Sequence, residues 1–320
     1  MTSLLKAMYA LQHAIFALPN AMPGAITQGM LWGIMAIGVY LTYRILNVSD
    51  LTVDGSLATG GAVCVMLIRL GCNPWIALLC AFFAGMLAGL VTGLFHTRCG
   101  IPAILAGILT QLALYSVNLR LMGGKANLPL SVDKYDLLVS QRNVRELSIG
   151  NPIFVAILIL TVVVGILYWF FGTEYGSVLR ATGANPHMAR AQGIDTKVGV
   201  TVGLMLSNGL VAASGALLAQ YQGAADVNMG RGAIVIGLAA VIIGEVLFSK
   251  VFRNFALKLV AVALGAVVYY LVIQFVLLLG LNTNDLKLLT ALVVAVFLAV
   301  PYWKAQVFRK KQVTGGGGNA

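Results

Sequence analysis

Long runs of apolar residues recur along the chain, and short polar stretches separate them. Most runs are close to the ~20 residues that an α-helix needs to cross the hydrocarbon core of a membrane. The pattern therefore predicts an all-α fold, a polytopic transmembrane helical bundle of about 8–10 spans. Two runs are short or Gly-rich, and we expect 54–71 and 231–248 to depart from simple straight spans. The nine runs lie at residues 25–43, 54–71, 75–95, 101–122, 151–172, 197–221, 231–248, 256–280 and 286–303.

The first twenty residues carry an amphipathic pattern instead of a continuous apolar run. Apolar residues recur at alternating four- and three-residue steps, while Lys6 and His13 lie on another face. This spacing predicts a helix over residues 1–20 that lies in the membrane interface, ends near Pro19 and Pro23, and is not a span. The apolar positions are Leu4, Met8, Leu11, Ile15 and Leu18.

Composition supports a lipid environment. Sixty per cent of the residues are hydrophobic and 10% are charged, whereas a soluble domain carries about 25% charged residues. A soluble fold of 320 residues has too small an interior to hide that much apolar surface. We therefore interpret residues 1–320 as a single transmembrane domain.

The distribution of basic residues predicts the orientation. The chain has 21 Lys and Arg against 10 Asp and Glu, and most basic residues stand singly between apolar runs, which argues against a nucleic-acid groove. With nine alternating spans and a cytoplasmic C-terminus, twelve basic residues fall inside and nine outside, the bias expected at a bacterial inner (cytoplasmic) membrane. Residues 123–150 then form an outer loop, 173–196 a cytoplasmic segment and 304–320 a basic, Gly-rich tail. The N-terminus falls outside, unless residues 1–20 form a further span.

No catalytic or metal-binding constellation stands out in the sequence. The four Cys form no C-x-x-C pair, the three His lie in different regions, and no G-x-x-x-x-G-K-[ST] loop is present to hold ATP phosphates. We expect this chain to have no catalytic residues, no metal and no cofactor of its own.

Two segments resemble each other weakly. Residues 50–61 read Asp-Leu-Thr-Val-Asp-Gly-Ser-Leu-Ala-Thr-Gly-Gly and follow the first run, and residues 226–237 follow the sixth with a similar order of acid, glycines and small residues. The preceding runs have opposite directions in the predicted topology, which is typical of an inverted repeat. Chance similarity between two Gly- and Ala-rich helices is the alternative.

A polar stretch between two strong apolar runs, residues 174–195, has the features of a short capped helix. Asn185 is a favourable N-cap, Pro186 is tolerated at the first helical position, and Gly193 is a natural stop. The pattern predicts about two turns over residues 186–192, a rigid knob that another protein can grip. The alternative is an ordinary connecting loop.

This stretch closely resembles the cytoplasmic coupling segment of permeases in the branched-chain amino acid and ribose-type ABC importer family. The matching positions are Gly176, Arg180-Ala181, Gly183 to Pro186, Ala189 and Gly193-Ile194. Residues 50–62 are similar to a segment of the sugar branch, but Asp54 stands where that branch usually has Gly. The amino-acid branch is therefore favoured.

The resemblance implies an importer that works by alternating access. Two permease chains, identical or paralogous, would pair around a pathway, a cytoplasmic ATPase dimer would bind ATP and Mg, and an extracytoplasmic protein would deliver a small polar solute. We expect that solute to be an amino acid, with aromatic amino acids as one subset, while sugars and nucleosides stay open. The residues expected to couple to the ATPase are Glu174, Gly176, Arg180, Gly183, Asn185, Pro186, Ala189, Arg190 and Gly193.

Polar groups inside apolar runs are costly unless they are paired or face water, so they are candidates for the translocation pathway. For each, the alternative is a helix–helix hydrogen bond of about 1 kcal/mol that holds the bundle together. Glu245 is expected to pair with Lys250 or Arg253 instead. The candidates are Gln28, Trp32, Asp54, Thr110, Gln111, Asn118, Asn208, Asp226 and Asn228.

Two other functions fit an apolar bundle. An ion-coupled secondary transporter or channel would use carboxylates near the membrane midplane, and Asp54 and Asp226 are the candidates for that role. A membrane scaffold without transport activity is the third hypothesis.

Overall fold

A computed structural model describes residues 2–145, 151–248, 251–252 and 254–278, together with several positions between 288 and 299; side chains are described from residue 21 onward. Most of the predicted span 286–303 and the whole tail 304–320 lie outside the described residues.

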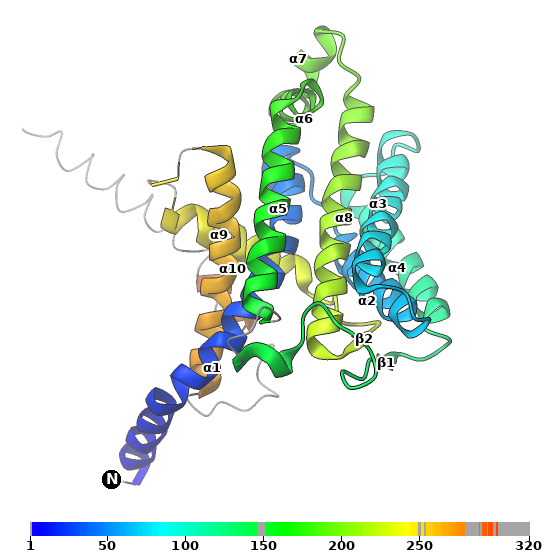
Figure 1. The fold of residues 1–320 in the computed structure, drawn as a ribbon. Helices are drawn as coiled ribbons and strands as arrows, with labels where there is room; N and C mark the ends of the chain where they lie inside the picture. Colours follow the sequence, from blue (N-terminus) through cyan, green and yellow to red (C-terminus); the bar gives the residue numbers. More distant parts are fainter. Residues whose placement is uncertain are drawn as a thin grey trace, which may run out of the picture.

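Helices dominate the fold, as the apolar runs predict (Figure 1). Among the described residues, six helical segments are long and apolar enough to cross a membrane. Three of them, over residues 74–97, 103–121 and 152–172, leave broad apolar faces exposed, as expected when the solvent is lipid, whereas 21–45 and 196–222 are mostly buried inside the bundle. The six are α1 (Thr2–Tyr40) from Ala21 on, with its π-helical end (Leu41–Ile45), α3 (Pro74–Thr97), α4 (Ala103–Leu121), α5 (Pro152–Gly172), α8 (Thr196–Gln222) and α10 (Phe255–Leu278).

Two further apolar helices are shorter, and both begin inside the bundle. Helix α2 (Val53–Arg69) has 17 residues and α9 (Ala233–Phe248) has 16, about 25 Å at 1.5 Å per residue. The first turn of α2 contacts α8 near Asn208, about halfway along that helix. The runs 54–71 and 231–248 therefore depart from simple straight spans, as expected: in each, the chain reaches the interior of the bundle as a non-helical segment and continues to the other end as a short helix.

The N-terminal segment is not a separate helix. Helix α1 continues through Pro19 and Pro23 without a break, so the predicted end of an interfacial helix at these prolines is wrong. A proline removes one backbone hydrogen bond, and helices that cross membranes tolerate this where neighbouring groups satisfy the freed carbonyls. The Thr27 hydroxyl donates to the Pro23 carbonyl at 2.9 Å, an added bond in the turn that follows the second proline.

The predicted inverted repeat is present in the backbone. The first helix of each half ends at a residue in the left-handed conformation, Asn47 (φ 53°) and Gly223 (φ 70°). Each is followed three residues later by an Asp whose Oδ1 accepts a hydrogen bond from the backbone N–H two residues on. These bonds measure 2.9 Å at Asp50 and 2.6 Å at Asp226. The same offset of 176 residues (223 minus 47, 226 minus 50) relates both pairs.

The crossing of α1 and α8 shows the same symmetry. The Ser207 hydroxyl donates to the Gly38 carbonyl at 2.7 Å, and the Ser214 hydroxyl donates to the Leu31 carbonyl at 2.8 Å. The offset of 176 relates Leu31 to Ser207 and Gly38 to Ser214, so each contact is the counterpart of the other. Because the earlier residue of one helix meets the later residue of the other, the two helices run in opposite directions. Chance similarity does not produce this pairing.

The predicted outer loop and the polar segment 173–196 lie at opposite ends of the bundle (Figure 1). In the loop, β1 (Asn127–Pro129) pairs antiparallel with β2 (Ala224–Asp226), with Leu128 opposite Ala225. The turn η2 (Gln141–Arg145) follows. The strand pair ties the loop to the end of α8. The loop therefore covers the end of the bundle at which the chain leaves α8 and turns toward α9.

Close helix packing depends on glycine where α2 and α3 lie against α8. A methyl group added at Gly60 would overlap the Ala212 carbonyl oxygen, and one added at Gly85 would overlap that of Asn208. By contrast, Gly165 on α5 faces open space. Small residues at such contacts let helix backbones approach closely without lipid between them.

We expect Gly60→Ala to lower the stability of the purified protein by about 1–3 kcal/mol, because α2 must move away from α8. Gly165→Ala is the matched control, and it should be neutral or stabilising by up to about 1 kcal/mol, the ordinary helix preference for Ala. Thermal unfolding in detergent measures both. Equal melting temperatures for the two variants would contradict the packing described here.

Candidate functional site

The polar segment between α5 and α8 folds into two short helices, α6 (Glu174–Ala184) and α7 (Pro186–Ala191), at one end of the bundle (Figure 1). The Asn185 side chain accepts hydrogen bonds from the backbone N–H groups of His187 and Met188, both at 3.1 Å. Gly193 follows in the left-handed conformation, with φ +81°. The predicted cap, helix and stop are confirmed, and the alternative of an ordinary loop is excluded.

Helix α6 is seated firmly on the bundle. A methyl group at Gly183 would overlap the Ile45 carbonyl oxygen at the end of α1, and one at Gly176 would overlap the backbone of Phe171. The Arg180 guanidinium lies over the Phe255 ring, 4.5 Å from its centroid, and 5.3 Å from that of Phe171. Helix α6 is therefore in direct contact with α1, α5 and α10.

Helix α7 is the exposed part of the same segment. Met188 is 63% exposed, and only Ala189 on this helix is buried. The nine residues expected to couple to an ATPase thus divide into an exposed group and a group that seats the segment. Glu174, Arg180, Asn185, Pro186, Arg190 and Gly193 are exposed, whereas Gly176, Gly183 and Ala189 are buried or half-buried.

The two short helices α2 and α9 begin close to each other inside the bundle, and Asp54 joins them. Its Oδ2 accepts a hydrogen bond from the Gly232 backbone N–H at 2.9 Å, and its Oδ1 accepts one from the Ile234 N–H at 3.0 Å. A carboxylate of α2 thereby caps the N-terminus of α9, where the helix dipole also stabilises its negative charge. Gly230, the repeat counterpart of Asp54, packs against the Asp54 carbonyl so closely that only glycine fits.

A cavity of about 400 Å³ opens beside this junction, between α2, α4 and the turn before α9. Asn118 on α4 is 1% exposed, and its side-chain amide has no hydrogen-bond partner among the described residues; the side-chain oxygen Oδ1 of Asn228 also has none. Buried amides without partners are rare and require an explanation such as water or a bound polar group. The polar residues that line the cavity are Asp54, Gln111, Tyr115, Asn118, Asn228 and Arg231.

Four of the nine predicted pathway residues, Asp54, Gln111, Asn118 and Asn228, therefore share one cavity. Tyr115 and Arg231 were not predicted. Arg231 lies three residues after Asn228 in the turn before α9. Its position next to a predicted pathway residue was visible in the sequence.

Three other predicted pathway residues have hydrogen bonds within the bundle. Asn208 accepts from the Ser56 hydroxyl and donates to the Asp50 carboxylate, both at 2.6 Å. The Thr110 hydroxyl accepts from that of Thr92 at 2.9 Å. The Asp226 side chain closes its own turn. These bonds match the alternative of contacts that hold helices together.

The last two predicted pathway residues lie elsewhere. Gln28 lines a separate cavity of about 480 Å³ with Arg142 and Tyr221. Trp32 is buried in the main apolar core, with its ring 5.8 Å from that of Tyr270.

Glu245 pairs with a residue that the sequence did not predict, and its expected pairing with Lys250 or Arg253 stays a prediction. Its Oε1 accepts from Nε of Arg44 at 2.9 Å, which links the end of α9 to the end of α1. Arg44 and Glu245 are 201 positions apart, so sequence proximity favoured Lys250 and Arg253 instead. Both of those lie outside the described residues.

The bundle has an inverted repeat with two short helices that begin in its interior, a polar cavity where they meet, and a rigid capped helix at one end. These features define a polytopic transport permease. The chain matches, over residues 22–301, the family described as the permease component of the branched-chain amino acid transport system, and it belongs to this family. The predicted resemblance is confirmed, and the chain is a multi-pass membrane protein of the ABC permease class. The family is not a catalytic one.

Several proteins are similar to the chain over most of its length. The tyrosine transport system permease protein of Clostridioides difficile (strain R20291) is 40% identical over 274 residues, which cover 86% of this chain and 89% of that protein. An uncharacterized protein of Rickettsia prowazekii (strain Madrid E) is 34% identical, with 88% and 97% covered. The ribose import permease protein RbsC of Escherichia coli (strain K12) is 24% identical, with 66% and 64% covered.

We expect Asp54→Ala to destabilise the protein by about 1–2 kcal/mol, because two N–H groups at the start of α9 lose their acceptor and α2 loses its link to α9. Asp195→Ala is the matched control, since exposed Asp195 caps α8 in the same way through the Lys197 and Val198 N–H groups but joins no second helix. Its loss should be smaller. Thermal unfolding and amide hydrogen exchange at residues 232–234 measure the difference, and equal effects would contradict a cap that joins two helices.

Proposed function

We propose that this chain is the membrane subunit of an ATP-driven importer that carries an amino acid, specifically an aromatic amino acid, by alternating access. The observation that carries the proposal is the pairing of a rigid, capped α7 with a seated α6, because this arrangement suits a device that transmits force into the bundle. Similarity to a tyrosine transport permease over most of both chains supports the substrate class.

The cavity beside Asp54 suits such a substrate. An α-amino acid carries an ammonium and a carboxylate, and the cavity offers the Arg231 guanidinium for the carboxylate together with unpaired amides at Asn118 and Asn228. Tyr115 provides a ring against which an aromatic side chain can pack. We propose Gln111, Asn118, Asn228 and Arg231 as contacts of the pathway, with Asp54 holding the wall of the cavity.

The assembly follows from the same proposal. A cytoplasmic ATPase dimer binds ATP and Mg and contacts α7, a second permease chain completes the pathway, and an extracytoplasmic protein delivers the substrate at the end that carries β1 and β2. The α7 end and the C-terminus then face the cytoplasm of a bacterial cell, in its inner membrane. This orientation agrees with the excess of basic residues predicted on that side.

Ion-coupled transport is less well supported. Its candidate carboxylates, Asp54 and Asp226, both accept hydrogen bonds from backbone N–H groups in the turn before α9 or in the first residues of α9. A carboxylate that must also bind and release a cation would lose those bonds in each cycle.

We expect Met188→Asp to weaken association with the ATPase at least about tenfold, because an exposed apolar anchor on α7 becomes a charge at the interface. Leu70→Asp is the matched control: Leu70 is an exposed apolar residue that ends α2, away from α7. Co-purification and permease-stimulated ATP hydrolysis measure the effect. ATPase binding that survives Met188→Asp unchanged would contradict the role of α7, and uptake without any ATPase would favour the ion-coupled alternative.

We expect Asn118→Leu to reduce uptake of labelled tyrosine at least about tenfold with little loss of stability, because the removed amide has no hydrogen-bond partner among the described residues and the new side chain is apolar. Thr110→Val is the comparison on the same helix, and it should lower the melting temperature more than it lowers uptake because the Thr110 hydroxyl is hydrogen-bonded. Uptake assays and thermal unfolding on the same preparations separate the two. Normal uptake by Asn118→Leu would remove this cavity from the pathway.

A further inference from the structure

An ion pair joins the end of α1 to the end of α9, and the transport cycle proposed above gives it no role. The Arg44 Nε donates to the Glu245 Oε1 at 2.9 Å. Arg44 also lines two cavities at the end of the bundle that carries α7. One, of about 820 Å³, is lined by Glu245, and the other, of about 460 Å³, by Arg180 and Gly183 of α6. Arg44 therefore lies between α6 and α9.

The turn that carries Arg44 has an unusual backbone. Residues Leu41–Ile45 form a π-helical turn, in which the Leu46 N–H donates to the Leu41 carbonyl, five residues earlier, at 3.0 Å. Turns of this kind are rare, and they occur frequently at functional sites. This local backbone is therefore a reason to ask what Arg44 does.

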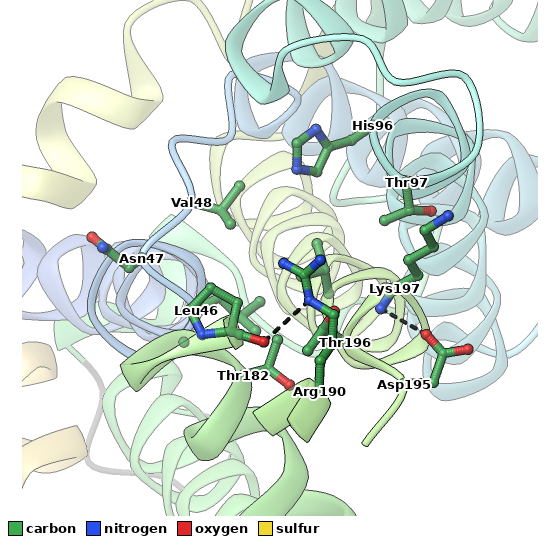
Figure 2. A pocket seen from close by; sticks show the side chains of 13 residues that line it. Leu46, Asn47, Val48, His96, Thr97, Thr182, Arg190, Asp195, Thr196 and Lys197 are labelled. Carbon is green, nitrogen blue, oxygen red and sulfur yellow. Dashed lines mark hydrogen bonds between the residues drawn. The ribbon is translucent and has the colours of Figure 1, made fainter. Parts of the chain in front are cut away.

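Helix α6 packs directly on the same turn. A methyl group at Gly183 would overlap the Ile45 carbonyl oxygen, so the two backbones are in contact. The residues that follow the turn, 46–48, line a further cavity together with Gly183 and with Arg190 of α7 (Figure 2). The segment that couples to an ATPase in the proposed function thus rests on the part of α1 that carries Arg44.

Helix α9 is held at both of its ends. Asp54 of α2 caps its first turn, and Arg44 pairs with Glu245 in its last turn. An acid in the last turn is unfavourable, because the negative end of the helix dipole lies there. Glu245 therefore does not stabilise α9 by itself, and the Arg44 guanidinium offsets the cost of its charge.

We propose that Arg44 and Glu245 are positioning residues for transport, which fix the end of α9 relative to the π-helical turn on which α6 rests. A shift of α6 then moves Arg44, and the ion pair carries α9 with it. The other end of α9 is bound to Asp54, beside the cavity that Asn228 and Arg231 line, so the shape of that cavity changes too. This inference rests on the proposed function and adds two residues to it.

The pair is too exposed to contribute much to stability. The side chains of Arg44 and Glu245 are 57% and 35% exposed, and exposed ion pairs add little to the free energy of unfolding. A contact also shifts an equilibrium between two conformations only by its own free energy. We therefore expect loss of the pair to change coupling by a small factor, about threefold, with almost no change in melting temperature. A purely structural role would not change coupling at an unchanged melting temperature.

The first test measures the tyrosine taken up per ATP hydrolysed by the complete transporter, with its ATPase and binding protein, in proteoliposomes. Arg44→Gln and Glu245→Gln should each lower this ratio about threefold, and both together should lower it no further, because one substitution already breaks the pair. The swapped pair, Arg44→Glu with Glu245→Arg, should restore the ratio. Lys258→Gln is the matched control, since it removes a cation from the same two cavities and leaves the pair intact.

The second test needs no ATPase, because it follows amide hydrogen exchange in the purified permease. Glu245→Gln should speed exchange at residues 232–234, at the far end of α9, about twofold to threefold, since α9 loses one of its two restraints. Lys258→Gln should leave exchange there unchanged.

A normal uptake ratio in Glu245→Gln, a loss that the swapped pair does not restore, or an equal loss in Lys258→Gln would overturn the inference. Unchanged hydrogen exchange at residues 232–234 in Glu245→Gln would overturn it as well. Absence of ATP-driven uptake by the unmodified protein would instead contradict the proposed function, and the hydrogen-exchange result would then decide by itself whether the pair links the two ends of α9.

Discussion

Two short helices begin in the interior of the bundle, and the N–H groups of their first turns must find acceptors there without bulk water. Asp54 meets this requirement for α9 with both oxygens of its carboxylate. The Asx turns at Asp50 and Asp226 fix the backbone that leads into α2 and into α9. Irregular backbone at membrane depth persists only where it is buried in protein or lines a cavity, so these carboxylates permit the two interrupted helices on which the architecture depends.

The repeat explains why the junction lies at the centre. Residues 31 and 38 of α1 each pair with the other's counterpart on α8, and Asp54 packs against its own counterpart Gly230. An inverted repeat places equivalent residues around one axis, and departures from symmetry then mark specialised positions. An acid at 54 and a glycine at 230 is one such departure, because two carboxylates in contact would repel and two glycines would leave the α9 N-terminus without a cap.

Each end of the bundle is connected to the junction of α2 and α9 by a short stretch of chain. At one end, Gly183 packs against the carbonyl at the end of α1, and the loop that contains Asn47 leads from there into α2. At the other end, the β1–β2 pair joins the loop 123–150 to the turn that leads into α9. A displacement of α6 and α7 would therefore have a short route to the backbone around the Asp54 cavity, as the alternating access proposed above requires.

Much of this arrangement follows from local sequence. The apolar runs predicted the helices, the Asn185-Pro186 pair and Gly193 predicted α7, and the acid-and-glycine pattern predicted the repeat, because each signal is carried by neighbouring residues. Pairings across the chain left no such signal. The Ser56–Asn208–Asp50 network and the Arg44–Glu245 pair join residues more than 150 positions apart, so the sequence did not separate Asn208, which holds helices together, from Asn118, which lines a cavity. The continuity of α1 through two prolines was likewise hidden, since a proline pattern alone favours a helix end.

The orientation of the bundle connects these features to uptake, and the accessibility of single cysteines in intact cells tests it directly. In a variant whose four native cysteines are replaced, a cysteine introduced at exposed Met188 or at exposed Ser131 is treated with a membrane-impermeant maleimide. The account predicts that the cysteine at 131 reacts in intact cells and that the one at 188 reacts only after permeabilisation. Labelling of position 188 from outside would contradict the cytoplasmic location of α7 and the ATP-driven mechanism built on it.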